Sequence, residues 1–427
     1  MRKSSLRRAT LRFSILLLAL ASLAVAARAQ APAAPKPAIR TITAFVNLDR
    51  GRYRIDVSET VAFLKRARTT FEARGYTVQT LRLVTQPFPE YTRGLSRADA
   101  LQFFKNLDGL AQQENIMVSI GPANLSSADA AAQADLLADI LANTKILEGT
   151  VLVTKNDAVD WPAVRLAAGV VKKVADSTLH SEGNFRFAAL AGVSPYTPFF
   201  PAAYHSGSGH QFAIGFESAN VVAAAFQDAP DFAAAKRKLT DLLYPQAFDA
   251  EDIALRISAD VGWNYLGLDL SPAPSKNASI GAAIEALTKA PFGGSGTLTA
   301  SATITGALKD IGARRTGYNG LMLPVLEDPR LADRWDAGFY SMDALLAYSA
   351  VCGTGLDTVP LPGDVTQDAL AAIIGDVASL SVKWSKPLSA RLLPVSGKRA
   401  GQRTEFSDPA LINGVIQPLP GTLNLAR

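Results

Sequence analysis

The chain has 427 residues, of which 48% are hydrophobic and 19% are charged. This composition excludes disordered and fibrous proteins and supports a large packed core. The formal charge of +5 favours an anionic partner, but six of the 43 basic residues lie in the first 29 residues, which hold no acid, leaving 37 bases against 38 acids. Net charge therefore gives no support for nucleic-acid binding, and we expect no nucleic-acid partner.

Residues 1–29 have the pattern of a secretory signal peptide. A basic start precedes the apolar stretch 13–26, and Ala27-Arg28-Ala29 forms a cleavage site before Gln30. The apolar stretch is shorter than the roughly 20 residues that a permanent membrane helix needs. We expect an exported protein, periplasmic or secreted, without stable membrane insertion after cleavage. The alternative is an uncleaved membrane anchor.

The next segment, residues 30–39, is rich in Ala and Pro, which predicts a tether without a regular hydrogen-bond ladder. Cys352 is the only cysteine, so an intramolecular disulfide is impossible even where the compartment would permit one. Stability must therefore come from the packed core.

From residue 40 onward, short β-rich runs alternate with helical runs. Strands are predicted at 41–48, 77–84, 116–120, 150–154, 185–190, 211–217, 265–270, 321–325 and 388–393, and helices at 57–74, 128–142, 162–176, 230–244, 279–288, 299–309, 340–350 and 367–383. No linker interrupts this alternation. The pattern predicts one α/β, barrel-like domain over 40–427, with about ten strands, surrounding helices and an extended C-terminal tail.

The segment 351–364 carries a thiol, two carboxylates, glycines and prolines. We expect a rigid loop in a cavity, with Cys352 as a candidate nucleophile or acid–base group and Asp357 and Asp364 as candidate catalytic carboxylates. The alternative is a buried cysteine that packs as a small apolar side chain.

Two of the three histidines, His205 and His210, fall in one Gly/Ser-rich loop at 204–210. Imidazoles suit proton transfer or metal binding, but the spacing matches no established zinc motif, so a metal is left open. The alternative is that both histidines are solvated loop residues.

Asn184 and Arg186 are candidates for binding a carboxylate, because a guanidinium offers two parallel donors. The alternative, slightly favoured by the pattern, places Arg186 outward on a strand between Phe185 and Phe187.

Asp269 and Ser271 follow a predicted strand and lead towards a predicted helix. This arrangement offers backbone N–H groups to an anion. Ser279 would then cap the helix, which is also a purely structural role. The glycine-rich run 293–297 lacks the lysine of a phosphate-binding loop, so nothing supports nucleotide binding.

At these segments the sequence resembles an uncharacterised family, domain of unknown function 711, from Arg40 to about Phe406. The stretches that carry the resemblance are 351–364, 199–207, 268–274, Glu327-Asp328 and 389–398.

The resemblance implies a fold like the ten-stranded barrel of the pyruvate formate-lyase and anaerobic ribonucleotide reductase group. Cys352 looks like the cysteine that a loop carries into that barrel. The run 314–320 is similar to the glycine motif of these enzymes but precedes the cysteine. Glycyl-radical chemistry is therefore not expected.

No settled activity comes with the resemblance. We expect an enzyme that acts on a small polar or carboxylate-bearing molecule in the barrel. Cys352 and a histidine of the 204–210 loop would meet in one cavity, and Arg391 or Lys398 would hold an anion. This chemistry requires no cofactor, and the sequence leaves cofactor, metal and oligomeric state open. The alternative is a periplasmic binding protein that holds a small polar ligand or metal without turnover.

Overall fold

The computed structural model describes residues 35–125 and 127–419. The expected signal peptide and the first part of the expected tether lie outside the described residues. Ala38 and Ile39, which the sequence places in the tether, belong to the first strand. The described residues from Lys36 onward cluster as one compact unit. That this unit unfolds as one cooperative domain stays a prediction.

Nine strands form one mixed sheet in the order β10-β11-β7-β4-β3-β2-β1-β8-β9. The five central strands are mutually parallel, and each edge carries a pair of strands that runs antiparallel to them. The strand bounds are β1 Ala38–Val46, β2 Val78–Thr85, β3 Met117–Ala123, β4 Leu147–Leu152, β7 Phe187–Ala191, β8 Gln211–Glu217, β9 Asn264–Asp269, β10 Gly355–Pro362 and β11 Leu388–Val395. A separate two-residue pairing joins β5 (Thr154–Lys155) to β6 (Ala158–Val159).

The predicted strand 321–325 does not form a strand, and part of the predicted loop 351–364 does form one. The run 321–325 makes only an isolated bridge, from Pro324 to Asp357. The central part of the expected loop 351–364 is β10, although it contains Pro360 and Pro362. Proline lacks the N–H that a strand donates, but β10 is the last strand of the sheet and needs a full ladder on one side only.

The segment 315–325 spans the gap between the two edge strands of the sheet. Arg315 forms a parallel bridge with Leu268 on β9, and Pro324 forms one with Asp357 on β10. The backbone N–H of Leu268 donates to Arg314 (2.8 Å), and that of Val325 donates to Asp357 (3.0 Å). This segment therefore pairs with both edge strands of the sheet, β9 and β10.

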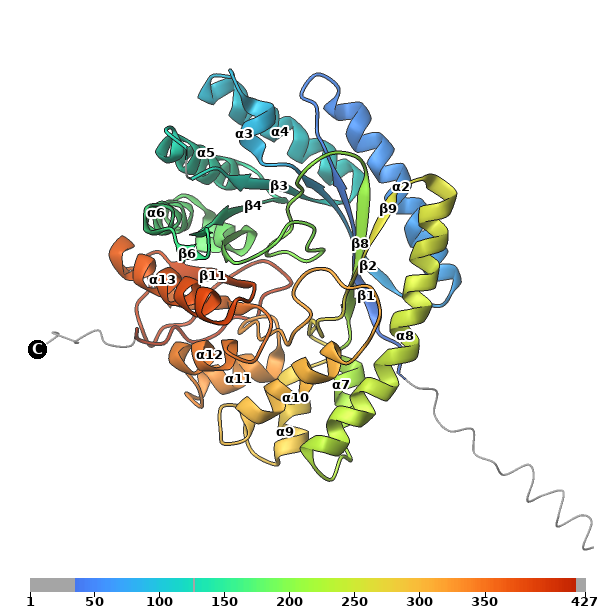
Figure 1. Cartoon of the computed structure of the whole chain (residues 1–427). Helices are drawn as coiled ribbons and strands as arrows, with labels where there is room; N and C mark the ends of the chain where they lie inside the picture. Colours follow the sequence, from blue (N-terminus) through green and yellow to red (C-terminus); the bar gives the residue numbers. More distant parts are fainter. Residues whose placement is uncertain (1–34, 126, 420–427) are drawn as a thin grey trace, which may run out of the picture. The chain divides into compact units, whose positions relative to one another are not determined.

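The helices lie around the outside of the strands (Figure 1). Their bounds are α2 Tyr53–Ala73, α3 Phe88–Thr92, α4 Arg97–Glu114, α5 Ala130–Asn143, α6 Trp161–Ser177, α7 Ala219–Phe226, α8 Phe232–Val261, α9 Ile280–Thr288, α10 Thr297–Lys309, α11 Pro329–Asp336, α12 Met342–Ser349 and α13 Gln367–Trp384, with a 3₁₀ segment at Leu179–Arg186. The sequence pattern did not predict α3, α4, α7 and α11. It ended α8 near residue 244, whereas the helix continues through Pro245.

Local sequence explains several helix ends. The Ser96 hydroxyl accepts from the backbone N–H of Asp99 and caps α4. The Thr366 hydroxyl accepts from the backbone N–H of Ala369 and caps α13 in the same way. Ser279 caps α9 in the same way, as its structural alternative predicted. The helix α2 begins at Tyr53, one turn before the predicted start at 57, and Asp56 in its first turn accepts from the Asp49 N–H and from Arg52.

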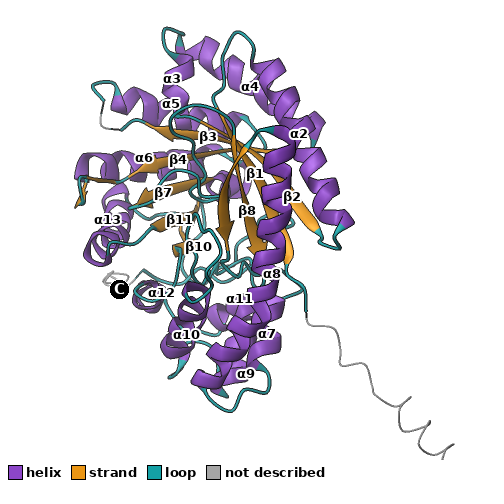
Figure 2. Cartoon of the chain, turned by 45° about the vertical axis from the view of Figure 1, so that its right-hand side comes forward, coloured by secondary structure: helices purple, strands orange, loops and turns teal. Residues whose placement is uncertain are grey.

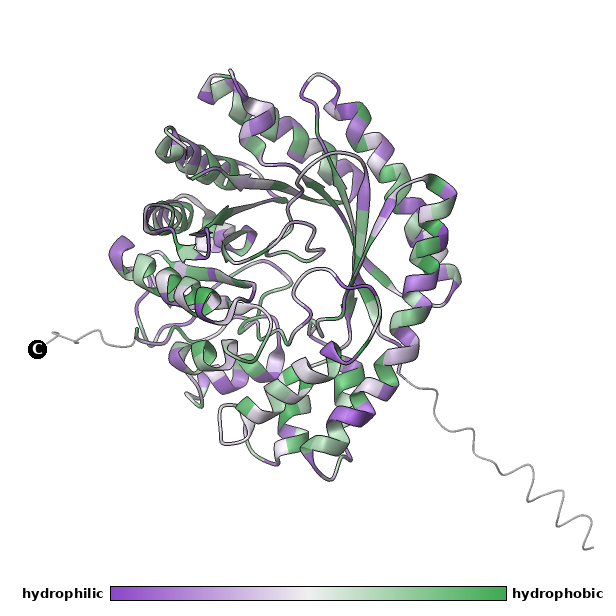
Figure 3. Cartoon of the chain, in the orientation of Figure 1, coloured by the Kyte–Doolittle hydropathy of each residue, from purple (hydrophilic) through white to green (hydrophobic). Residues whose placement is uncertain are grey.

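The two faces of the sheet differ in chemistry. On the outer face, residues such as Ile42, Leu83 and Val118 pack with the helices into the main apolar core, and the helix sides towards the strands are mostly hydrophobic (Figure 3). On the inner face, the same strands place buried polar residues, among them Arg82 and Glu148. Strand alternation alone accounts for this separation, because successive side chains point to opposite faces.

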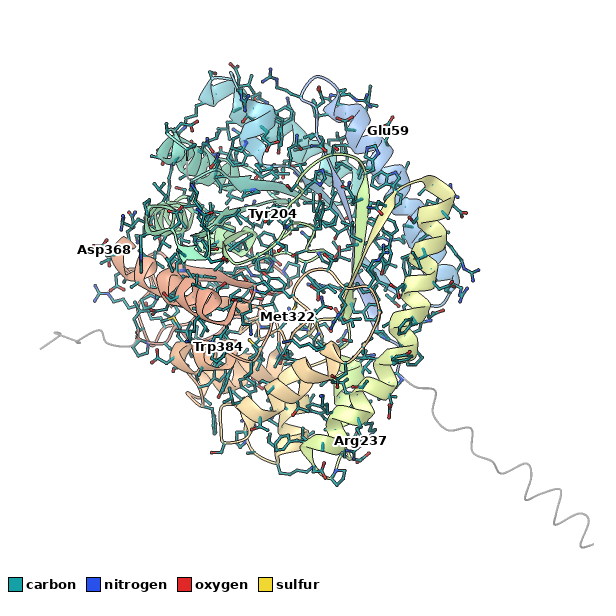
Figure 4. All side chains as sticks on the ribbon, viewed as in Figure 1. Glu59, Tyr204, Arg237, Met322, Asp368 and Trp384 are labelled. Atoms are coloured by element: carbon teal, nitrogen blue, oxygen red, sulfur yellow. The ribbon has the colours of Figure 1, made fainter. Side chains whose placement is uncertain are left out.

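Loops fill the space against the inner face of the sheet (Figure 2). Phe199 and Tyr204, which follow β7, pack with Tyr318 and Met322 into a second, smaller cluster. In Figure 4, Tyr204 and Met322 lie in the middle of the molecule, whereas Glu59 lies on the outer helices. Tertiary packing, not solvent, surrounds these loop residues.

Candidate functional site

Five charged side chains form a continuous series of ion pairs on the inner face; we call them the interior ion cluster. In order, they are Glu217, Arg40, Glu327, Arg391 and Asp357. Arg40 lies 3.5 Å from Glu217 and 3.9 Å from Glu327. The Arg391 guanidinium contacts Glu327 and donates from Nε to Asp357 Oδ1 at 2.6 Å. Two residues predicted from the sequence, Asp357 and Arg391, are therefore in direct contact.

The cluster joins strands that are far apart in the sheet order. Arg40 is on β1 and Arg391 is on β11, five strand spacings away. In a flat sheet, these positions would lie roughly 24 Å apart at about 4.8 Å a strand. Both guanidiniums nevertheless contact Glu327, which follows the segment 315–325. The sheet is therefore strongly curved around its inner face.

Burial determines the protonation of the cluster. Loss of solvent raises the pKa of Glu327, and the charge of Asp357 raises it further; the attraction of Arg391 and Arg40 only partly opposes this. Burial lowers the pKa of Arg391, but the charges of Asp357 and Glu327 outweigh it and raise the pKa above its ordinary value. Arg391 therefore stays charged, whereas Glu327 holds a proton more readily than an ordinary glutamate does.

A second buried pair extends the polar inner face. Arg82 on β2 contacts Glu148 on β4, and the hydroxyl of Ser119 donates to the same carboxylate at 2.6 Å. Together with the interior ion cluster, this gives four carboxylates and three guanidiniums. The excess of one carboxylate favours retention of a proton, or binding of a cationic group, in the interior.

Aromatic side chains line the cluster. The Arg391 guanidinium lies 4.8 Å from the ring centre of Phe185 and 5.9 Å from that of Phe200. Burial raises the pKa of Tyr318, whose hydroxyl donates to the Pro201 carbonyl at 3.3 Å. These rings exclude water from one side of the guanidinium, while Arg40 keeps 35% of its side-chain surface exposed and connects the cluster to solvent.

Cys352 lies in the turn before β10, is buried, and belongs to the main apolar core. Its backbone N–H donates to Tyr348 at 2.8 Å. The ammonium of Lys386 donates to the carbonyls of Ser349 and Cys352. Burial lowers the pKa of Lys386, which the nearby Cys352 partly opposes. Lys386 thus binds the last carbonyls of α12 and fixes the cysteine turn.

A close backbone approach holds the cysteine turn against the segment 315–325. A Cβ added at Gly320 would lie 2.5 Å from the Cα of Gly353, and one added at Gly353 would lie 2.6 Å from the Gly320 carbonyl carbon. No side chain fits at either position. The glycines of both loops therefore serve this contact.

His205 is buried and binds residues of the β1 and β2 ends. Its Nε2 lies 2.9 Å from Asn47 Oδ1, and its backbone N–H donates to Thr85 at 3.1 Å. Within the described part of the chain, Nδ1 has no hydrogen-bond partner. Burial, with a contribution from His210, lowers the pKa of His205 to about 4.

His210 is exposed and stacks on Trp263, with ring centres 4.8 Å apart. Among the described residues, the recorded contacts of His205 and His210 do not include Cys352. Convergence of the thiol and an imidazole on one cavity stays a prediction.

Asp269 and Ser271 organise the segment 315–325. The buried Asp269 carboxylate accepts from the backbone N–H groups of Tyr318 (2.7 Å) and Asn319 (3.0 Å) and from the Ser271 hydroxyl (2.6 Å). Burial raises its pKa, and these hydrogen bonds oppose the change. Both side chains are thus engaged in holding the segment in place.

Asn184 and Arg186 bind backbone carbonyls. Asn184 Nδ2 donates to Val171 at 2.8 Å. Arg186 donates to Leu141 and Leu147 at 2.7 and 2.8 Å. Arg186 ends the 3₁₀ segment and precedes β7, so it is not on the strand that the sequence suggested. This geometry ties both side chains to the α5–β4 and α6 regions.

Asp364 and Lys398 lie at the other end of β10 and β11. Asp364 is exposed beyond β10. Lys398 pairs with Glu405 at 2.7 Å, and its carbonyl accepts from Gly363. Neither side chain is part of the interior ion cluster.

The sequence did not single out Arg40, Arg82 or Glu148, and it named Glu327 only within the family motif. A signal was present: Arg82 stands between Leu81 and Leu83 in a predicted strand. Such a position puts a charge on the face opposite an apolar one. Only the curvature of the sheet shows that this face is also buried.

In the described ranges 35–125 and 127–419, no group of three or more His, Cys, Asp or Glu side chains is arranged to hold a metal ion. In the same ranges, no helix has both the length and the apolar character needed to cross a membrane.

Comparison with known proteins places the chain among uncharacterised relatives. The family model described as "Uncharacterised ACR (DUF711)" matches residues 33–407. A "UPF0210 protein" of Pyrobaculum islandicum is 32% identical over 395 residues, 85% of this chain and 86% of the relative. A UPF0210 protein of Neisseria meningitidis is 29% identical over 261 residues, 58% of this chain and 57% of the relative. The chain therefore belongs to the DUF711 family.

Proposed function

We propose that the protein is an enzyme that acts on a small polar or carboxylate-bearing molecule by proton transfer at the interior ion cluster. The observation that carries this proposal is the buried Glu327 carboxyl, whose pKa is raised while it contacts the permanently charged Arg391. A carboxyl with a raised pKa holds a proton more readily than an ordinary glutamate does, as a general acid requires.

The side chains of the cluster suit separate roles. Arg40, which is partly exposed, is placed to receive a substrate carboxylate from solvent. Glu327 and Asp357 are the candidate proton carriers, and Arg391 fixes both of them. The aromatic rings of Phe185 and Phe200 limit the access of water to Arg391.

This assignment moves the chemistry from the thiol and the histidines to the carboxylates. Cys352 packs in the main apolar core, and His205 binds Asn47. A Cys/His mechanism remains the second candidate, because the Nδ1 atom of His205 is buried without a partner among the described residues. Substituting Cys352 with Ala tests that mechanism: loss of turnover with little loss of stability supports it.

We further propose that the curved sheet is completed as a barrel, with the segment 315–325 in the place of a tenth strand. Its bridges to both β9 and β10 support this closure. We also propose export of the mature chain, periplasmic or secreted, on the basis of the first 29 residues. N-terminal sequencing of the protein from a native host tests export, and an intact Met1 would contradict it.

Hydrogen–deuterium exchange tests the proposed activity. The chain from residue 30 onward is incubated in D₂O with lactate, malate, alanine and aspartate, and the C2 proton signal is followed by NMR. Exchange of at least one compound, lost in Glu327→Gln and Asp357→Asn, supports proton transfer at the cluster. Exchange that survives both substitutions contradicts it.

The matched control is Glu405→Gln, which makes the same change at an exposed carboxylate paired with Lys398. It should exchange like the unsubstituted chain. Saturation transfer from the protein to one of these compounds, without exchange, favours the binding-protein alternative. If none of the four compounds shows exchange or saturation transfer, both functions are contradicted for this substrate class. Thermal melts confirm that each variant is folded.

A further inference from the structure

A cleft of about 910 Å³ lies at the carboxyl ends of β2, β3 and β4. α3, the start of α4 and the start of α5 form its walls. Its volume is within the range of about 300–1,000 Å³ that small-molecule sites occupy. Ligands of parallel α/β sheets bind beyond the carboxyl ends of the strands, which is where this cleft lies.

The cleft is separate from the interior ion cluster. None of its lining residues belongs to that cluster. On β1 and β4, the charged residues Arg40 and Glu148 lie near the strand starts, whereas the cleft is lined by Leu152 and by residues beyond the strand ends. A ligand in the cleft therefore occupies a different site from the proposed substrate.

One part of the cleft wall is apolar. Leu95, Leu136 and Leu152 line it and are each partly exposed, while Phe88 lies buried behind them. A ligand that covers these three side chains removes apolar surface from water, which is favourable by about 25 cal/mol per Å². The wall thus suits a molecule with a hydrocarbon portion.

Two cations lie on the rim without a partner. Arg93 and Lys155 are exposed and line the cleft. In the described part of the chain, no carboxylate or other acceptor binds the guanidinium of Arg93 or the ammonium of Lys155. By contrast, Arg97 in the same wall is shared by Asp139 and Asp135.

Two acids, Asp129 and Glu90, also line the cleft. Asp129 is engaged by hydrogen bonds from Gln133 and Ser127, which lower its pKa. Glu90 is exposed and is the remaining acid of the lining. Counted with Arg97, the lining holds three cations against these two acids, an excess of one cation beside an apolar wall.

We propose that this cleft binds a small organic anion, with its carboxylate at Arg93 and Lys155 and its hydrocarbon portion against Leu95, Leu136 and Leu152. This site is additional to the proposed enzyme activity. Arg93 offers two parallel donors to a carboxylate, and Lys155 adds a second charge. The apolar wall then distinguishes such a ligand from inorganic anions.

Isothermal titration of the chain from residue 30 onward tests the site with hexanoate, phenylacetate and indole-3-acetate, each against its uncharged primary amide. We expect at least one carboxylate to bind about tenfold or more tightly than its amide, because a hydrogen bond to a charged group contributes that much. Arg93→Gln and Lys155→Gln should each weaken this carboxylate by a similar factor, and Leu95→Asn should weaken both carboxylate and amide.

Lys105→Gln is the matched control, because it removes a charge from the exposed side of α4 outside the cleft. It should bind like the unsubstituted chain. Equal binding of carboxylate and amide, unchanged binding in the Arg93→Gln/Lys155→Gln double variant, or no binding of any of the three carboxylates at millimolar concentration would overturn the proposal. Loss of binding in Glu327→Gln would place the probes at the interior ion cluster and would also overturn it.

Discussion

The two faces of the same sheet are built for different purposes. Ile42, Leu83 and Val118 on the outer face pack in the main apolar core, and their burial is favourable without a polar partner. Arg82, Glu148 and Arg391 on the inner face are equally buried, but each requires a charged partner. The outer face therefore supplies stability, whereas the inner face costs stability and is the better place to look for function.

The largest effect is expected from removing the central cation of the inner face. Arg391→Leu leaves Asp357 and Glu327 buried without their guanidinium, which should lower the free energy of unfolding by about 3–5 kcal/mol. Urea unfolding at pH 7 measures it. Adding Asp357→Leu should recover part of the loss. A loss below about 1 kcal/mol would show that the cluster is solvated, and the contrast between the faces would fail.

A comparable but smaller loss is expected on the outer face. Leu83 is fully buried in the main core, so Leu83→Ala should cost about 3 kcal/mol through lost burial and a cavity. Unlike Arg391→Leu, this loss should not depend on pH between 5 and 8. A strong pH dependence would mean that the outer core is coupled to the ion cluster.

His205 should make the stability of the inner side depend on pH. Its pKa is about 4 in the folded chain and about 6.5 in the unfolded chain, so the unfolded state takes up a proton first as pH falls. Stability is complete above about pH 7 and declines towards pH 4, by about 2 kcal/mol between pH 7 and pH 5.

His205→Gln should lack this part of the decline in urea unfolding at pH 7 and pH 5. The exposed His180, changed to Gln, serves as the control and should keep the decline of the unsubstituted chain. If His205→Gln loses as much stability between the two pH values as the control does, the imidazole is not buried in its neutral form.

Cys352 should behave as a buried residue of the main apolar core. It packs with the main core, so Cys352→Ala should cost about 1 kcal/mol, as the loss of one small buried group does. In the folded chain, its thiol should react with iodoacetamide far more slowly than in 6 M urea. Rapid alkylation in the native state would instead favour the Cys/His mechanism.

The smallest effect is expected from an ion pair outside both faces. Lys65 and Glu114 lie 2.8 Å apart on exposed helix surfaces, and Lys65→Gln should change the free energy of unfolding by less than about 0.5 kcal/mol. Chemical denaturation at low and high salt checks this. A larger loss would mean that charge pairs stabilise this protein generally, whichever face they occupy.

Much of the fold was predictable where the pattern is local. The strands at 41–48 and 211–217 match β1 and β8 closely, because a buried strand shows itself as a short β-branched or aromatic run. The pattern failed at β10, where Pro360 and Pro362 indicated a loop. Whether a proline is tolerated depends on whether the strand is an edge, and strand order is not a local property.

The candidate site was predictable only in part. Asp357 and Arg391 were named from the sequence, but for separate roles, and their contact with each other was not foreseen. Asp269 was named as a ligand-binding residue, and its hydrogen bonds to the backbone of Tyr318 and Asn319 were not foreseen. The sequence shows the same aspartate whether its carboxylate binds a ligand or the backbone N–H groups of a turn.

The sequence by itself determined the α/β class, the family and the residues that carry charge in apolar strands. Those features follow from composition, period-two alternation and motif order, all of which act over short stretches of chain. Only the tertiary structure decided that Arg40 and Arg391, 351 positions apart in the numbering, share Glu327. The curvature of the sheet brings them together, and curvature results from the packing of all strands and helices rather than from any one segment.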